Sequence, residues 1–144
     1  MPRTRPEKPQ TSEQIALLCA AAAYDKKADN MNLLNVSKLS GYTDYFLIAS
    51  ASSTRQVAAV ADNIHLVLKK SGIKPLGLSG IKEGQWALLD FGDVVVHIFY
   101  GPMRDYYDLE SFWADAPRHE LDLEQLTTLI PVPKRGRPRK VAIN

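Results

Sequence analysis

The sequence contains one cysteine and no run of 18 apolar residues. Because Cys19 stands alone, the chain can form neither an intramolecular disulfide nor a zinc site built from several cysteines. The absence of a long apolar run argues against a membrane-spanning helix. We therefore expect a protein of the reducing cytoplasm, with no membrane partner.

The N-terminal region combines basic residues with a following apolar run, residues 15–23, which loosely resembles a secretory signal. However, four polar residues, 11–14, separate the charges from the run. An amphipathic helix explains the same pattern, because Ile15, Leu18 and Cys19 fall on one helical face. We favour the helix over the signal peptide.

Motifs of the common enzyme classes are also missing. The sequence has no P-loop, no Gly-x-Ser-x-Gly elbow and no His-Glu-x-x-His pair. The tripeptide Asp90-Phe91-Gly92 matches a magnesium-binding motif of kinases, but the Gly-rich loop, the lysine strand and the catalytic His-Arg-Asp loop are absent. Size alone opposes that fold, since only about ninety residues precede the tripeptide.

Three ionisable residues in and around the same tripeptide are candidates for a smaller chemical site. Asp90, Asp93 and His97 are residue types that bind a divalent ion or exchange protons, and Asp90 and His97 would share one face of a strand. The alternative is that Asp93 is a turn residue and His97 a half-exposed strand residue. We prefer this second interpretation, and we predict no catalytic residue, no metal site and no cofactor.

What the sequence does contain is an uneven distribution of charge. Residues 83–124 hold ten acidic and two basic residues, whereas residues 131–144 hold five basic residues and no acid. The acidic region suits a basic protein partner, and the basic tail suits a phosphate backbone. The tail residues predicted to bind nucleic acid are Lys134, Arg135, Arg137, Arg139 and Lys140.

The tail sequence "PKRGRPRK" resembles an AT-hook, in which arginines enter a narrow minor groove. One short match is unspecific, since any basic tail binds polyanions by releasing counterions. We favour RNA or phosphate binding in general, and keep a solubilising role and specific DNA binding as alternatives. We expect residues 1–10, with three prolines, to be disordered.

Hydrophobic periodicity and turn residues predict the elements of a layered α/β domain with a mixed sheet. Helices are expected from Thr11 to about Lys27, from Ser53 to Gly72, and from Pro102 to Asp115, with a weaker one within 119–130. Strands are expected at 31–36, 45–51, 76–78, 86–91 and 94–100.

The last two strands form the most informative pattern. Gly92-Asp93 between them is a Gly-X pair typical of a two-residue hairpin. Pairing Phe91 with Val94 would place an apolar face against the helices and leave an opposite face of aromatic and ionisable groups. That opposite face is only half suited to water, so we expect it to bind a partner. Pairing with a second copy of the chain remains open.

Four ordered segments resemble the ribosomal silencing factor family, also called Iojap-like. They are "TDYFLIAS" (43–50), "SSTRQVAAVADNI" (52–64), "WALLDFGDVVVHIF" (86–99) and "YYDLESFWADAP" (106–117). The resemblance covers about residues 12–117. The matching residues are Thr43, Asp44, Ser53, Arg55, Gln56, Asp62, Trp86, Asp90, Gly92, Asp93, His97, Tyr107, Leu109, Glu110 and Trp113. Asn35, Ala51 and Ser79 depart from the family pattern.

The resemblance implies a non-catalytic domain, at residues 11–117, with a fold related to nucleotidyltransferases. It implies binding to ribosomal protein fourteen of the large ribosomal subunit, which blocks joining of the small subunit and represses translation. Residues 118–144 are expected to be an extension ending in the basic tail. The candidate partner-binding residues are Trp86, Leu88, Asp90, Asp93, His97, Phe99, Tyr107 and Glu110.

Two other hypotheses stay open. One is metal-dependent, nucleotidyltransferase-like phosphoryl transfer at Asp90 and Asp93, for which Ser79-Gly80 would be a poor phosphate-binding turn. The other is a nucleic-acid-binding module that works through the tail, with ribosomal RNA as its candidate ligand.

Overall fold

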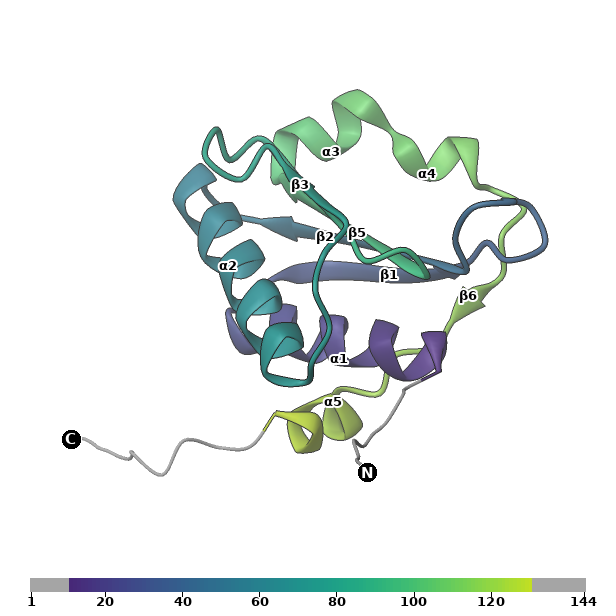
Figure 1. Ribbon diagram of the computed structural model, residues 1–144. Helices are drawn as coiled ribbons and strands as arrows, with labels where there is room; N and C mark the ends of the chain where they lie inside the picture. Colours follow the sequence, from purple (N-terminus) through teal and green to yellow (C-terminus); the bar gives the residue numbers. More distant parts are fainter. Residues whose placement is uncertain (1–10, 131–144) are drawn as a thin grey trace.

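The structure is a computed structural model that describes residues 11–130 (Figure 1). The predictions for residues 1–10 and for the basic tail at 131–144 lie outside the described residues. Within 11–130, the strands are β1 (Asp29–Asn35), β2 (Tyr45–Ala51), β3 (Gly77–Ser79), β4 (Trp86–Asp90), β5 (Val94–Tyr100) and β6 (Arg118–His119). The helices are α1 (Ser12–Asp25), α2 (Thr54–Lys70), α3 (Gly101–Tyr107), α4 (Leu109–Phe112) and α5 (Leu123–Leu129).

The described strands form one sheet in the order β3-β4-β5-β2-β1-β6. The two central strands, β2 and β5, run parallel, and the other neighbours pair antiparallel. Helices cover both faces of the sheet, with α1 and α2 on one side and α3 and α4 on the other (Figure 1). The predicted α/β layered domain with a mixed sheet is confirmed.

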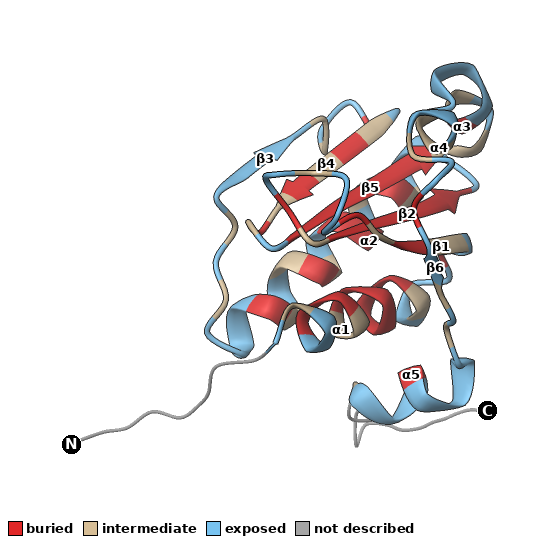
Figure 2. Cartoon of the chain, turned by 90° about the vertical axis from the view of Figure 1, so that its right-hand side faces the viewer, coloured by how far each residue is buried: buried red, intermediate tan, exposed pale blue. Residues whose placement is uncertain are grey.

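Burial follows from this layering. All seven residues of β2 are buried, as expected for an apolar strand that is covered on both faces (Figure 2). The alternation predicted for the hairpin is also observed: Ala87 pairs with Ile98 and Leu89 with Val96, and these four side chains join the core beneath α1 and α2. Gly92 has a φ of 88°, the left-handed conformation that a Gly-X turn needs.

The predicted helix boundaries on this face are largely confirmed. The side chain of Thr11 accepts a hydrogen bond from the Gln14 N–H, and the Gln14 side chain accepts one from the Thr11 N–H, which completes a capping box. At the start of α2, the Ser53 hydroxyl accepts from the Gln56 N–H, but the Gln56 amide oxygen accepts from the residue before the cap. Gly72, at a φ of 83°, terminates α2.

The opposite face of the hairpin is less exposed than we predicted. Here α3 and α4 close over β2 and β5, and Met103, Leu109 and Trp113 pack against a second cluster of buried residues that includes Phe46 and Phe99. The Phe46 and Trp113 rings meet edge to face, with centroids 4.9 Å apart. The protein therefore has a core on each side of its sheet, and only the β4 side of the second face remains partly open.

The segment after Pro102 was predicted to be one helix, and this is wrong in one respect. Asp108 adopts a left-handed conformation, with φ 49° and ψ 49°, and separates α3 from α4. The helical spacing of Tyr106, Leu109 and Trp113 gave no sign of this interruption. The break changes the direction of the chain and brings Glu110 back toward Arg104.

The segment expected to lie outside the domain also belongs to the fold. Residues 118–119 form β6, which pairs with β1, and Leu126 of α5 is fully buried in the core with α1. Helix α5 lies against α1 on the side away from the sheet (Figures 1 and 2). Residues 118–130, which we assigned to an extension, therefore pack on the same sheet and core as residues 11–117. Among residues 11–130, no helix is long and apolar enough to span a membrane.

Candidate partner-binding surface

A strip of half-buried side chains follows β4 at the open side of the second sheet face. It consists of Trp86, Leu88 and Asp90, flanked by Tyr107 of α3 and Tyr42 of the 36–44 loop, and we call these five residues the β4 strip. Small residues on β3 leave the strip uncovered, because Gly77 pairs with Asp90 and Ser79 with Leu88. This open part of the sheet face therefore presents apolar and acidic groups together.

Trp86 is the largest side chain of the strip, and neighbours hold it on several sides. Its ring stacks on Phe99 at 5.0 Å between centroids and lies 4.7 Å from the ring of Tyr107. The indole Nε1–H donates a hydrogen bond of 3.1 Å to Nδ1 of His97. Trp86 thus has a fixed inner side and a partly exposed outer side, as expected of a binding anchor.

His97 lies beneath the strip rather than in it. We predicted a half-exposed residue, but only 4% of its surface is accessible, because Phe46 and Trp86 cover it. Burial lowers the pKa of His97 to about 4, so that the ring is neutral at physiological pH. Phe99 is fully buried as well. These two predicted partner-binding residues therefore support the strip from below and present no surface of their own.

The acidic end of the strip is fixed by the hairpin turn. One Asp90 carboxylate oxygen accepts a 2.8 Å hydrogen bond from the Gly92 N–H, and the other accepts from the Tyr42 hydroxyl. This carboxylate raises the pKa of Tyr42, because hydrogen bonding to it favours the protonated phenol. The Asp93 side chain is exposed, and its carbonyl accepts from the N–H groups of Asp44 and Tyr45.

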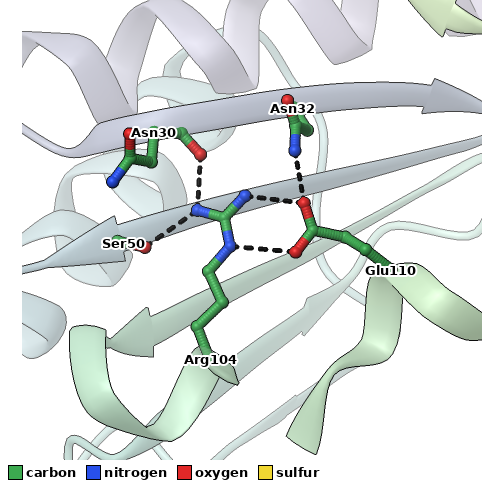
Figure 3. Close-up of polar contacts among 5 residues, drawn as sticks. All are labelled: Asn30, Asn32, Ser50, Arg104 and Glu110. Atoms are coloured by element: carbon green, nitrogen blue, oxygen red, sulfur yellow. Dashed lines mark hydrogen bonds and ion pairs between the residues drawn. The ribbon is translucent and has the colours of Figure 1, made fainter. Parts of the chain in front are cut away.

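Glu110, also a predicted partner-binding residue, is engaged inside the protein (Figure 3). Its two carboxylate oxygens accept bonds of 3.1 and 2.8 Å from Nε and Nη2 of Arg104, and the Asn32 amide donates to it as well. Hydrogen bonds from Arg104 hold the pKa of Glu110 below its usual range. Arg104 also donates to the Ser50 hydroxyl, at 2.8 Å, and to the Asn30 carbonyl.

Sequence reasoning missed this cluster. Arg104 is one of two cations among the ten acidic residues of 83–124, which is a weak signal that a positive charge is paired within the fold. The cluster joins α3 and α4 to β1 and β2, so its role is to hold the cover of the second core in place. Glu110 keeps 28% of its side chain accessible, which limits its contact with a partner.

The geometry gives no support to a phosphoryl-transfer site at Asp90 and Asp93. Ser79 pairs with Leu88 and Gly80 lies against Trp86, which is four residues, roughly 13 Å of strand, from Asp90. A cavity of about 420 Å³ does exist at the carboxyl ends of β2 and β5, where Ser52 and Arg104 line it, but neither aspartate does. Among residues 11–130, no three His, Cys, Asp or Glu side chains are grouped to hold a metal ion.

The comparisons with known proteins agree on one family. The family model "Ribosomal silencing factor during starvation" matches residues 9–140. The chain is 39% identical over 112 residues to ribosomal silencing factor RsfS of Halalkalibacterium halodurans, which covers 78% of this chain and 96% of that protein. It is 41% identical over 110 residues to RsfS of Bacillus subtilis, covering 76% of this chain and 93% of that protein.

Solved structures show the same relationship. A Chromobacterium violaceum protein superposes with a TM-score of 0.72 at 36% identity, covering 73% of this chain and 88% of that one. A Bacillus halodurans protein superposes with a TM-score of 0.69 at 38% identity, covering 76% and 99%. With a matching family model over most of the chain and relatives near 40% identity, the chain belongs to the ribosomal silencing factor family.

Proposed function

We propose that this protein binds the large ribosomal subunit through its ribosomal protein fourteen, and blocks joining of the small subunit. Translation falls as a result. Membership of the ribosomal silencing factor family supports an association with ribosomes. A mouse relative, 35% identical over 78 residues, is named mitochondrial assembly of ribosomal large subunit protein 1, and that name connects the relative with the large subunit.

The observation that carries the proposal is the β4 strip. Trp86 and Leu88 offer a half-buried apolar centre, and the carboxylates of Asp90 and Asp93 lie at its end. Interfaces commonly place an aromatic anchor at the centre and charged groups at the rim, where the charges steer encounter and fix orientation. A basic ribosomal protein is the complementary partner for such a surface.

The wider charge distribution points to the same partner class. Asp105, Asp108 and Asp115 are exposed in and around α3 and α4, and no lysine occurs between residues 83 and 124. The electrostatic field of like charges on one surface increases the rate of association with an oppositely charged surface. We place this activity in the cytoplasm, where the proposed partner is.

Silencing requires exclusion as well as binding. A folded domain attached to the subunit-joining face of the large subunit occupies space that the small subunit needs, and no chemistry is involved. On this proposal the protein is a regulatory factor and not an enzyme, and its effect is a matter of occupancy.

The test has two steps. Wild-type protein is first sedimented with purified large subunits and, separately, with small subunits, and we expect it in the large-subunit pellet only. Light scattering then follows subunit joining as protein is added, and the joined fraction should fall in proportion to occupancy. Protein that stays in the supernatant, or that binds without slowing joining, contradicts the proposal.

A further inference from the structure

The hydrogen bond between Trp86 and His97 crosses the hairpin diagonally. Trp86 pairs directly with Phe99 and His97 with Leu88, so the indole reaches from its own position to the neighbouring pair on the same face. Its Nε1–H meets Nδ1 of His97 at 3.1 Å. This contact therefore fixes the rotation of the indole within the β4 strip.

Stacking alone leaves that rotation less restricted. Phe99 supports one face of the indole at 5.0 Å and an interplanar angle of 29°, and Tyr107 flanks it at 48°. Stacked rings have preferred tilts and offsets over a wide range of separations, whereas a hydrogen bond needs its donor aimed at the acceptor within a narrow range of distance and angle. The hydrogen bond to His97 is the directional contact among those described around Trp86.

His97 makes this contact at a cost to stability. Because Nδ1 accepts the indole proton, the neutral ring must carry its own proton on Nε2. That atom is buried and has no hydrogen-bond partner among the described residues. A buried donor without a partner destabilises a fold, and an apolar side chain of similar size would avoid the loss. The stability of the domain alone gives no reason for histidine here.

We propose that His97 is a positioning residue for the partner-binding surface: it holds the Trp86 indole in the orientation in which the β4 strip meets the ribosome. The inference rests on the proposed function and adds a residue that never touches the partner. Fixing a side chain before binding removes the entropy that would otherwise be lost at the interface.

Three variants of the full chain separate this role from core packing. His97→Leu removes the acceptor and the unpartnered donor together, and His97→Asn keeps an acceptor near the place of Nδ1. Val95→Ala is the matched control, because Val95 lies two residues away, on the same face and in the same buried cluster, and contributes no side-chain hydrogen bond. Each variant is measured for urea unfolding, for affinity to purified large subunits, and for the Trp86 indole N–H resonance.

The expected results differ for each variant. His97→Leu should unfold at the same or a higher urea concentration than wild type, yet bind large subunits roughly fivefold more weakly, the scale of ordering one side chain on binding. The Trp86 indole N–H resonance of this variant should shift upfield, and the indole proton should exchange faster with water. His97→Asn should recover affinity to within about twofold of wild type, and Val95→Ala should lose stability while keeping affinity.

Other results overturn the inference and are distinguishable from failure of the proposed function. Wild-type affinity in His97→Leu shows that the hydrogen bond does not serve binding, and leaves ribosome binding intact. Equal loss in His97→Leu and His97→Asn shows that shape rather than the acceptor matters. If wild-type protein does not bind large subunits at all, the proposed function fails and the inference fails with it.

Discussion

Arg104 and Glu110 meet in a two-pronged ion pair across the break between α3 and α4, with hydrogen bonds of 3.1 and 2.8 Å (Figure 3). The left-handed Asp108 between the two helices makes this geometry possible, because it turns α4 back toward α3. The guanidinium then reaches two strands through Ser50 and Asn30. One cation thereby connects α3, where it lies, to α4, β1 and β2, four of the elements around the second core.

Replacing Arg104 by Met should lower the free energy of unfolding by about 2–3 kcal/mol. The change leaves the Glu110 carboxylate and the Ser50 hydroxyl without their donor. Because Glu110 is partly exposed, the loss of stability should lie near the lower end of the range for breaking a buried ion pair. Urea denaturation measures it. Asp105→Asn, at the exposed neighbouring position, is the control and should stay within about 0.5 kcal/mol. Equal midpoints for Arg104→Met and wild type would contradict a structural role.

Much of the first core could be predicted from the sequence because its signals are local. Capping residues such as Thr11 and Ser53 act within one turn, and the Gly92-Asp93 turn fixes the register of the hairpin. The alternation of Ala87 and Leu89 then assigns one face to the helices. Periodicity and turns also indicate the layered α/β class, whereas the proposed function comes from the family resemblance, because periodicity contains no functional information.

The second core could not be predicted in the same way because its contacts join distant residues. The hairpin pattern predicts that His97 is a half-exposed strand residue. Its burial depends on Phe46, which precedes it by 51 positions. The Arg104 cluster draws on Asn30 and Ser50, which are equally remote in sequence. The candidate site residues could therefore be assigned to one face of the hairpin, but their depth below the surface could not be predicted.

Gly80→Ala should destabilise the protein by more than about 1 kcal/mol. Gly80 has a φ of 75°, and an added Cβ would lie 1.9 Å from the Trp86 carbonyl oxygen, so the backbone at the start of β4 must shift. Gly41→Ala is the matched control, because Gly41 has no described atom within 4 Å of such a Cβ. Urea midpoints compare the two. A Gly80→Ala protein as stable as Gly41→Ala would show that this turn is not constrained.

The pair of His119 and Glu13 should make stability depend on pH. His119 Nε2 lies 2.6 Å from Glu13 and Nδ1 lies 2.9 Å from the Glu120 carbonyl, so both ring nitrogens face acceptors. The bond to Glu13 raises the pKa of His119. A raised folded-state pKa gives stability that is fully present below the unfolded value near 6.5 and is lost as the pH rises through the folded value.

The measurement compares wild type with Glu13→Gln in urea at pH 5.5 and pH 8.5. The stability advantage of wild type over Glu13→Gln should be larger at pH 5.5 than at pH 8.5. It should not exceed about 1 kcal/mol, because the Glu13 side chain is exposed and solvent screens the pair. The double variant Glu13→Gln, His119→Gln serves as control and should show no such difference between the two pH values. An advantage that is constant, or that grows toward pH 8.5, is incompatible with a proton-linked contact.

Trp86→Ala should weaken binding to large ribosomal subunits by more than about 2 kcal/mol, roughly thirtyfold in dissociation constant. The indole is the largest group of the β4 strip, and its inner contacts hold it ready to bind. Leu66→Ala is the control, since Leu66 is an exposed leucine of α2 on the opposite side of the sheet. Co-sedimentation over a range of protein concentrations measures both. Equal affinity of the two variants would remove Trp86 as an anchor.

Replacing the five basic residues of the tail by Gln, in the full chain, should weaken ribosome binding in a salt-dependent way. The substituted residues are Lys134, Arg135, Arg137, Arg139 and Lys140. If all five neutralise RNA phosphates, the slope of log affinity against log salt should fall by up to about 3.5. Affinity is measured by co-sedimentation between 50 and 200 mM salt, roughly the range over which such contacts are lost.

Subunit joining separates an accessory tail from an essential one. At saturating concentration the charge-neutralised protein should still block joining, because the β4 strip and the folded domain are unchanged and exclusion depends on occupancy alone. Truncation after Ile130 should give the same result, since the described fold extends to that residue. If either variant saturates the large subunits but does not block joining, the tail performs the exclusion and the domain only brings it to the ribosome.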